Sequence, residues 1–197
     1  QNNTITWYEN DGNTDPSWTV ADEFAVNIPS FAQVVDIDGD GDLDILSASQ
    51  GDYGGEEPDL IILYENDGAA DPSWVAANIS ITEINSGLND AIAADIDGDG
   101  DMDIDGDGDM DIVSGLYRSD TVVWFENDGN AFPTWVAANI STSVDRVFNV
   151  IAEDINGDGI MDVISKTAGY LNHRINWHEN GGTFANVSLD TDNDGIP

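Results

Sequence analysis

The sequence predicts an all-β protein, built as an array of four-stranded antiparallel units that carry Asp-rich loops. An acidic segment of nine residues occurs at 36–44, 95–103 and 154–162, with a spacing of 59 residues each time. Short apolar segments rich in β-branched residues flank these segments, as at 32–35 and 45–48, and they favour strands. A repeat at a fixed period is the signature of stacked structural units.

Each unit is expected to contain two strands around the acidic segment, followed by two more. The third strand ends in Glu-Asn-Asp-Gly, as in Trp-Tyr-Glu-Asn-Asp-Gly at 7–12, and this pattern recurs at 63–68, at 124–129 and more loosely at 177–182. Asp-Gly indicates a hairpin turn, and a Pro-Ser-Trp or Pro-Thr-Trp segment then begins the fourth strand. The units expected are 5–27 (third and fourth strands only), 28–80, 81–141 and 142–189, about three and a half in a domain spanning 1–189, with 190–197 as an acidic tail or linker.

The acidic segments have the composition of calcium loops. Oxygen ligands at positions 1, 3 and 5 of a tight loop and a later carboxylate suit Ca²⁺, and glycine at positions 4 and 6 permits the turn. An EF-hand would need Glu at position 12, which is Ser47, Gly106 or Ser165 here. A solvated acidic turn is the alternative, which the recurrence in register disfavours. The predicted ligands are Asp36, Asp38, Asp40, Asp44 and the carbonyl of Asp42, and in the third loop Asp154, Asn156, Asp158, Asp162 and the carbonyl of Ile160.

The second loop contains a tandem duplication, in which residues 97–104 are repeated as 105–112. Two registers compete, and two ions are favoured over one because one ion would leave several carboxylates uncompensated. The first register uses Asp95, Asp97, Asp99, Asp101 and Asp103, and the second uses Asp103, Asp105, Asp107, Asp109 and Asp111. A fourth loop would begin with Asp190, Asp192 and Asp194, and its last ligand would be residue 198, so the sequence is expected to be a portion of a longer protein. Three to five Ca²⁺ ions are expected in all.

The charge of the chain excludes several classes of partner. Four basic residues stand against 40 acidic ones, giving a formal charge of −36, and 20 of the acids lie in the Asp-rich loops. Nucleic acids and anionic membrane surfaces require a basic surface, so neither is expected as a partner. No apolar run approaches the length of a membrane span, and the absence of cysteine excludes disulfides and thiolate metal sites. Calcium modules of low affinity belong outside the cell, which favours secretion.

The aspartate loops and the Trp-Tyr-Glu-Asn-Asp-Gly strand together resemble the FG-GAP/VCBS repeat family, over roughly residues 5–189. The family's members are the calcium-bearing blades of integrin-alpha-like β-propellers, so the resemblance implies propeller-like blades, calcium at the loop positions and no catalysis. Such propellers usually close with about seven blades, and propellers in general need at least about four, so this chain is not expected to close alone. The last eight residues resemble the start of a thrombospondin-type calcium repeat.

No catalytic constellation is legible, so the protein is not expected to be an enzyme. His173 and His178 are interpreted as solvated or packed, and the recurring Glu9, Glu65, Glu126 and Glu179 as structural hydrogen-bond acceptors. The function expected is a calcium-stabilised extracellular structural or adhesive module that pairs, or assembles head to tail into a filament, or continues in further domains. The alternative is a glycan-binding accessory domain of a secreted polysaccharide-acting enzyme, using exposed tryptophans, and a catalytic propeller ranks last. Asn78, Asn139 and Asn186 begin N-glycosylation sequons.

Overall fold

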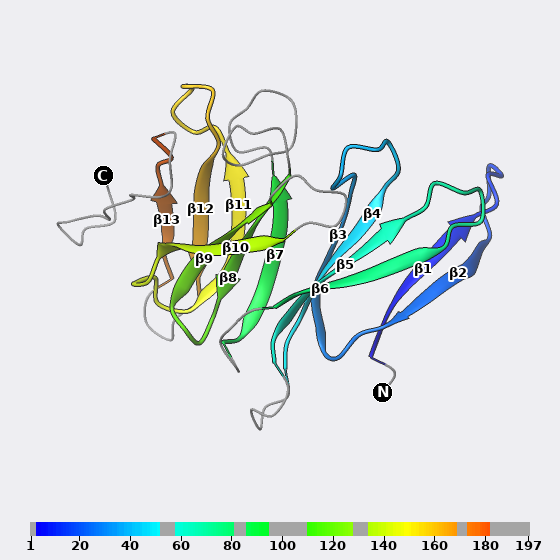
Figure 1. The fold of residues 1–197 in the computed structure, drawn as a ribbon, viewed down its shortest axis with the longest axis horizontal. Coiled ribbons are helices and arrows are strands. Elements are labelled where there is room, and N and C mark those ends of the chain that lie inside the picture. Colours follow the sequence, from blue (N-terminus) through cyan, green and yellow to red (C-terminus); the bar gives the residue numbers. More distant parts are fainter. Residues whose placement is uncertain are drawn as a thin grey trace.

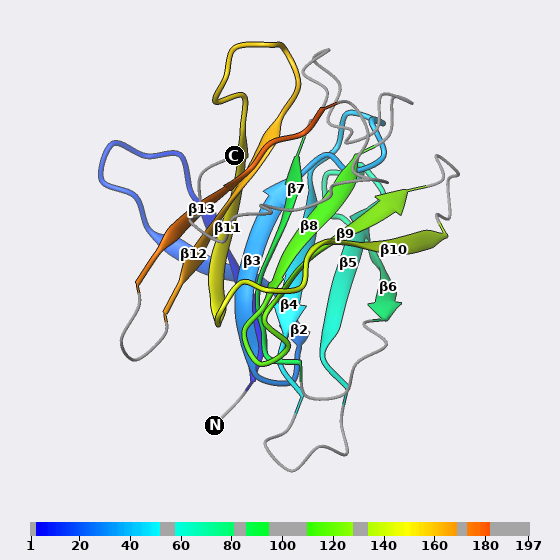
Figure 2. The same cartoon turned by 90° about the vertical axis from the view of Figure 1, so that its left-hand side faces the viewer.

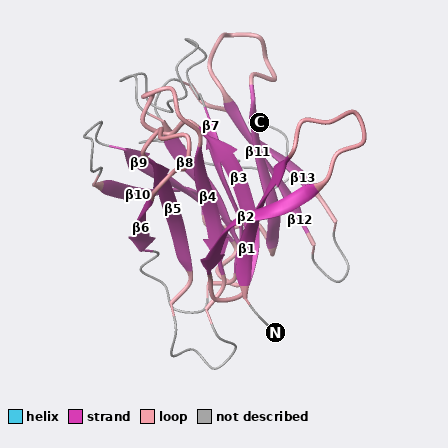
Figure 3. Cartoon of the chain, turned by 90° about the vertical axis from the view of Figure 1, so that its right-hand side faces the viewer, coloured by secondary structure: helices cyan, strands magenta, loops and turns pink. Residues whose placement is uncertain are grey.

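The computed structural model describes residues 3–51, 58–80, 86–94, 110–127, 134–168 and 173–181, and in these ranges the chain forms strands and no helix (Figures 1 and 3). Within each sheet, strands that follow one another in the sequence pair antiparallel. Because the described part contains no helix, it contains none that could cross a membrane. The strands are β1 (Thr4–Asn10), β2 (Trp18–Ala25), β3 (Pro29–Val35), β4 (Asp44–Ser49), β5 (Leu60–Asn66), β6 (Trp74–Ser80), β7 (Leu88–Ala94), β8 (Asp111–Leu116), β9 (Thr121–Asn127), β10 (Trp135–Ser141), β11 (Val147–Glu153), β12 (Asp162–Thr167) and β13 (Ile175–His178).

The strands form four sheets, each from a continuous stretch of sequence. A two-stranded sheet, β1–β2, precedes two four-stranded sheets, β3–β6 and β7–β10, and a three-stranded sheet, β11–β13. The sheets follow one another across the molecule and are not closed into a barrel (Figures 1 and 2). The predicted all-β array of antiparallel four-stranded units is therefore confirmed. The fourth strand expected in the last unit lies outside the described residues.

The Glu-Asn-Asp-Gly segments make a longer connection than a two-residue hairpin. β1 ends at Asn10 and β2 begins only at Trp18. Within this loop Gly12, at φ 74°, donates its N–H to Asn10 Oδ1 at 2.8 Å, and Gly68, at φ 68°, does the same to Asn66 at 3.0 Å. Both glycines occupy the left-handed region that residues with a Cβ rarely adopt. The segment therefore ends the third strand with an Asn-centred turn, and the rest of the loop leads to the fourth strand.

The hydrophobic core lies between successive sheets, because each sheet buries apolar side chains against its neighbour. Leu46, Ile61, Leu88 and Ile112 are fully buried between the second and third sheets. Val113, Val122, Val147, Val150 and Val163 fill the interface between the third and fourth sheets. Between the first and second sheets, the ring of Phe24 packs 4.6 Å from Tyr64 and 5.2 Å from Trp74, measured between centroids.

Hydrogen bonds from side chains join the first strands of neighbouring sheets. Gln33 on β3 reaches β7, where its Oε1 accepts the N–H of Ala93 at 2.9 Å and its Nε2 donates to the carbonyl of Ala93 at 3.3 Å. Asp90 on β7 reaches β11, where its Oδ2 accepts the N–H of Val150 at 3.0 Å and the side-chain amide of Asn149. These bonds fix the register between sheets that share no backbone ladder.

A buried carboxylate also links the second and third sheets. Asp59, directly before β5, is fully buried. Its Oδ2 accepts the hydroxyl of Ser86 at 2.6 Å and the N–H of Gly87 at 2.7 Å, both directly before β7. Asp120, directly before β9, accepts the N–H of Arg146 at 2.8 Å in the same way. The start of each following sheet is therefore anchored by the sheet before it.

Candidate metal centre

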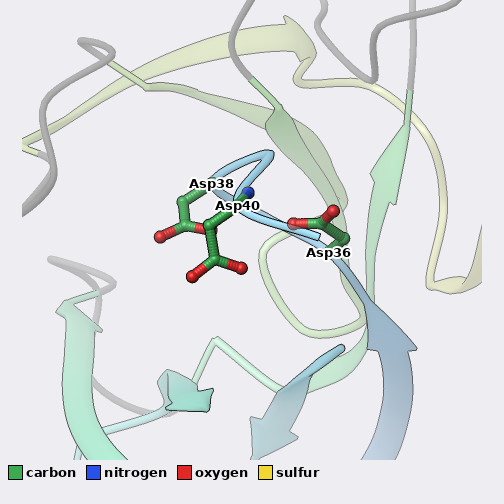
Figure 4. Close-up of side chains that lie close together, drawn as sticks. All are labelled: Asp36, Asp38 and Asp40. Atoms are coloured by element: carbon green, nitrogen blue, oxygen red, sulfur yellow. The ribbon is translucent and has the colours of Figure 1, made fainter. Parts of the chain in front are cut away.

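Three carboxylates of the loop between β3 and β4 converge on one point. Asp36, Asp38 and Asp40 each offer an oxygen, and these oxygens all lie within 4.8 Å of one another. Figure 4 shows the side chains of Asp38 and Asp40 next to each other, with the carboxylate of Asp36 across the loop. Two oxygens bound to one Ca²⁺ at 2.3–2.6 Å can be at most about 5 Å apart. The three oxygens are therefore close enough to share one cation.

The backbone of the loop is wrapped around these carboxylates. Asp36 Oδ2 accepts the N–H of Gly41 at 3.0 Å, Asp38 Oδ1 that of Asp40 at 3.2 Å, and Asp40 Oδ1 that of Asp42 at 2.9 Å. Gly39 and Gly41 have φ values of 71° and 98°, so the turn relies on both glycines. One oxygen of each carboxylate is thus used to shape the loop.

The remaining oxygen of Asp36 lacks a partner. Asp36 Oδ1 is inaccessible to solvent and has no hydrogen bond with any described residue. Leaving a buried acceptor unsatisfied costs about 1–3 kcal/mol, and more when the group is charged. A cation would satisfy it, so this atom fits the metal site predicted for the loop.

The last aspartate of the loop lies on the first residue of β4 and holds both ends of the loop. Asp44 is 1% exposed. Its Oδ2 accepts the N–H of Ile37 at 3.0 Å, and its Oδ1 accepts the N–H of Asn66, at the end of β5, at 2.8 Å. The side-chain amide of Asn66 donates in turn to the carbonyl of Leu43 at 3.1 Å. Asp44 therefore ties the loop to the third strand of its sheet.

The loop between β11 and β12 repeats this frame. Asp154 Oδ2 accepts the N–H of Gly159 at 3.0 Å, Asp158 Oδ1 that of Ile160 at 2.9 Å, and the buried Asp162 that of Asn180 at 2.8 Å. The difference lies at Asn156, whose side-chain amide donates to Asp158 Oδ2 at 2.9 Å and to Glu179 Oε1 at 3.4 Å. The two loops share a backbone frame but differ in charge.

Mutual repulsion is visible in the pKa values of the first loop. Burial raises the pKa of Asp38, and the charges of Asp40 and Asp36 raise it further. Burial likewise raises the pKa of Asp44, with a contribution from Asp38 and Asp40. Burial and the charges of Asp38, Asp44 and Asp40 raise the pKa of Glu65, on β5. The loop therefore favours either protons or a cation among its carboxylates.

The duplicated loop is described only at its two flanks. Ala94 at the end of β7 pairs with Asp111 at the start of β8, as Val35 pairs with Asp44 in the second sheet. Asp111 is 1% exposed, and its Oδ1 accepts the N–H of Asn127 at 2.7 Å. Asp111 thus takes the place of Asp44 and Asp162, and the second copy of the duplication ends within β8, at residues 111–112. The other expected ligands of this loop, and Asp190, Asp192 and Asp194 of the tail, lie outside the described residues.

The sequence reasoning missed the asparagine of the Glu-Asn-Asp-Gly segment. Asn66, Asn127 and Asn180 each donate a backbone N–H to the buried aspartate that begins the second strand of their own sheet. The signal was the recurrence of Asn at one position in every unit, to which the sequence analysis assigned no role. The recurring glutamate, interpreted as a hydrogen-bond acceptor, has that role in Glu179, which accepts from Asn156.

The other candidate residues are placed as follows. His178 is buried, with Nε2 2.9 Å from Ser165 Oγ, and burial lowers its pKa to about 4. Trp124 is buried and donates to Asp111 Oδ2 at 2.7 Å, whereas Trp18 is 59% exposed. Asn78 and Asn139 lie exposed on β6 and β10, the outermost strands of their sheets, and Asn186 lies outside the described residues.

Comparison with known proteins agrees with this geometry. The model of the FG-GAP-like repeat matches residues 36–104 and 103–165, which together span about two thirds of the chain. The second match begins at Asp103, the aspartate that the two registers of the duplicated loop share. No curated protein and no solved structure matches the chain. From the two consecutive matches, the chain belongs to the FG-GAP-like repeat family.

Proposed function

We propose that this protein is a non-enzymatic extracellular module of structural or adhesive function, whose β-sheets are stabilised by Ca²⁺ bound in the aspartate loops. Two observations carry the proposal: one oxygen each of Asp36, Asp38 and Asp40 lies within 4.8 Å of the other two, and Asp36 Oδ1 is buried without a partner among the described residues. The loop frame that holds them recurs at 154–162. Proteins of this repeat family are generally non-enzymatic and typical of extracellular or cell-surface settings. The part of the chain that the structure describes supports the metal site through its donors, which are hard oxygens throughout.

Calcium would act on folding in two ways. An ion held by Asp36, Asp38 and Asp40 would offset the burial and the repulsion by Asp40 and Asp36 that raise the pKa of Asp38. It would also hold the end of β3 close to the start of β4, because the loop that binds it connects these two strands. Asp44 joins the same loop to Asn66 at the end of β5. Since the unfolded chain has no preformed site, the free energy of binding adds directly to the free energy of unfolding.

Thermal unfolding with and without the ion tests this proposal. Removal of Ca²⁺ with excess chelator should lower the melting temperature by more than about 10 °C, and added Ca²⁺ should restore it. Mg²⁺ at the same concentration is the matched control, because it is smaller and gives up its water reluctantly. An unchanged melting temperature in chelator would contradict the proposal.

We further propose that the array associates with another repeat array through its outer sheet. The outward face of β11–β13 carries Ile151, paired with Ile164, and Ile175, which is 76% exposed. The corresponding face of each earlier sheet is covered by the next sheet, so another FG-GAP-like unit is the partner that fits. Sedimentation velocity should show dimers or longer assemblies that Ile151→Ser with Ile175→Ser disperses. A monomer at all concentrations would contradict self-association.

A further inference from the structure

All four basic side chains of the protein lie at the end of the sheets opposite to the aspartate loops. Arg118 lies in the turn after β8, whose last residue, Leu116, pairs with the first residue of β7. Arg146 and Arg174 directly precede β11 and β13, and Lys166, near the end of β12, pairs with Ile175. The acidic groups at this end include Asp59, Asp90, Asp120 and Asp145. The basic residues of a chain with a formal charge of −36 are thus confined to one end of the sheets, where Arg146 is already paired with Asp145.

A groove runs between two of these basic residues, Lys166 and Arg118, along the first strands of three sheets. One hollow of about 290 Å³ is lined by Phe31 on β3, Asp90 on β7, Phe148 on β11 and Lys166 on β12. A second hollow of about 300 Å³ is lined by Gln50, Tyr117 and Arg118, and it shares Asn89 and Phe148 with the first. The second hollow reaches the lower limit of small-molecule sites, about 300 Å³, the first lies just below it, and together they exceed it.

The groove contains a buried carboxylate with an unused acceptor. Asp90 is 2% exposed, and its Oδ2 is occupied by Val150 and Asn149. Its Oδ1 is inaccessible to solvent and has no hydrogen-bond partner among the described residues. Burial is also the main reason why the pKa of Asp90 is raised. A ligand hydroxyl that donates to Oδ1 would remove the cost of an unsatisfied buried acceptor.

An aromatic ring and an ammonium group stand beside this carboxylate. Phe148 is 49% exposed and borders both hollows. The ammonium of Lys166 lies 5.5 Å from the centroid of the Phe148 ring, and it forms no salt bridge within the described residues. The groove therefore offers an apolar flat surface, an acceptor for a hydroxyl and a cation.

We propose that this groove binds an anionic polysaccharide, a sugar chain whose residues carry carboxylate or sulfate groups. The C–H face of a sugar ring stacks on Phe148, a hydroxyl donates to Asp90 Oδ1, and the acidic substituents pair with Lys166 and Arg118. Nucleic acid also carries anionic groups, but a phosphate contact would leave Asp90 Oδ1 without a donor. The site is separate from the aspartate loops, so the proposal does not depend on calcium occupying them.

Calorimetric titration with hexasaccharides at fixed saturating Ca²⁺ tests the proposal. Hyaluronan hexasaccharide supplies carboxylates, chondroitin sulfate hexasaccharide supplies sulfates as well, and cellohexaose is the neutral control. The protein should bind at least one charged hexasaccharide and bind cellohexaose at least about tenfold more weakly, because a charge-assisted contact is lost. Absence of binding to both charged probes, or equal binding of the neutral probe, would overturn it.

Variants locate the binding. Lys166→Gln and Phe148→Ala should each weaken binding about tenfold. Arg174→Gln removes the same charge from a residue that lines neither hollow, and should change the affinity by less than about twofold. Asp90→Asn should also weaken binding, with its melting temperature measured because Asp90 holds β11. Equal affinity of all the variants, or affinity lost in Asp38→Asn and kept in Lys166→Gln, would place the ligand elsewhere.

Discussion

The loops 36–44 and 154–162 have the same backbone frame and different charge. In each, the first aspartate accepts the N–H of a glycine five residues later at 3.0 Å, and the last aspartate is buried against an Asn N–H at 2.8 Å. In the first loop Asp38 faces Asp40, and their charges repel. In the third loop Asn156 occupies the place of Asp38 and donates to Asp158. The same backbone frame therefore forms in the first loop despite the repulsion between two carboxylates, and in the third loop with a hydrogen bond between two side chains.

The residues of this one sequence motif have two separate roles, which are shaping the loop and binding a cation. The buried aspartate and its N–H donors shape the loop through hydrogen bonds. The number of unpaired carboxylates sets how much a bound cation stabilises the loop, because like charges so close are stable only when they are compensated. The first loop should therefore depend on Ca²⁺ more than the third.

The largest effects are expected at the shared frame. Asp44→Ala and Asp162→Ala each leave buried N–H groups without an acceptor, among them those of Asn66 and Asn180. Each change should lower the free energy of unfolding by about 2–4 kcal/mol, by a similar amount in the two loops and with or without Ca²⁺. Urea denaturation of both variants in Ca²⁺ and in chelator measures this. A loss confined to the calcium-bound state would mean that the two aspartates serve the ion alone.

The next largest effect is a dependence of the free energy of unfolding on pH, which is expected to come from the last sheet. His178 in the last sheet has a pKa lowered to about 4 by burial, against 6.5 in the unfolded chain, and Tyr64 is its counterpart in the second sheet. Below pH 6.5 the imidazole of His178 is protonated in the unfolded state but stays neutral in the folded state until the pH approaches 4. Stability should therefore fall by about 1.4 kcal/mol per pH unit between pH 6.5 and 4 through this residue.

Urea denaturation across this pH range checks the prediction with a matched pair. His178→Gln should remove that part of the pH dependence, whereas His173→Gln, which alters an exposed histidine, should leave it unchanged. Equal pH profiles for the two variants would show that His178 does not titrate in this way.

Exchanging the residues at the third position of the loops should exchange their calcium dependence. Asp38→Asn removes a predicted ligand charge and also the repulsion with Asp40, so it should stabilise the metal-free protein slightly and weaken Ca²⁺ binding about tenfold. Asn156→Asp should do the reverse in the third loop. Calorimetric Ca²⁺ titration of the two variants measures both changes. Changes in Ca²⁺ affinity of opposite sign at the two sites would support the proposed difference between the loops, and changes of the same sign would refute it.

The smallest effect is expected at the glutamate of the third strand. Glu65 is surrounded by the charges of Asp38, Asp44 and Asp40, whereas Glu179 accepts a hydrogen bond from Asn156. Without metal, Glu65→Gln should therefore stabilise the protein by a few tenths of a kcal/mol, and Glu179→Gln should destabilise it by a similar amount. Thermal unfolding in chelator distinguishes them, and equal shifts would indicate that the two glutamates have the same environment.

Much of the fold could be predicted from the sequence because corresponding strands and loops recur at corresponding positions of each repeat. The 59-residue spacing and the Glu-Asn-Asp-Gly strand ends place the strands and the loops between them. The links between sheets could not be predicted, because their residues differ from one unit to the next. Asp59 and Asp120 precede the third strands of two sheets, but Arg174 holds that position in the last sheet. The partners of Asp59 in the third sheet lie 27–29 residues away, and no local pattern connects them.

The same limit applied to the candidate site. The alternating aspartates predicted a set of converging oxygens, and Asp36, Asp38 and Asp40 do converge. The groove around Asp90 had no signature in the sequence, because its residues come from β3, β7, β11 and β12 and meet only when the sheets stack.

We propose that a calcium ion bridges the aspartates of each loop. An anomalous difference map from crystals grown with Ca²⁺, recorded at a long wavelength, tests it most directly. A peak should lie about 2.3–2.6 Å from oxygens of Asp36, Asp38 and Asp40, and a second peak should lie in the loop of Asp154 and Asp158. Well-ordered loops without a peak at either position would contradict the account.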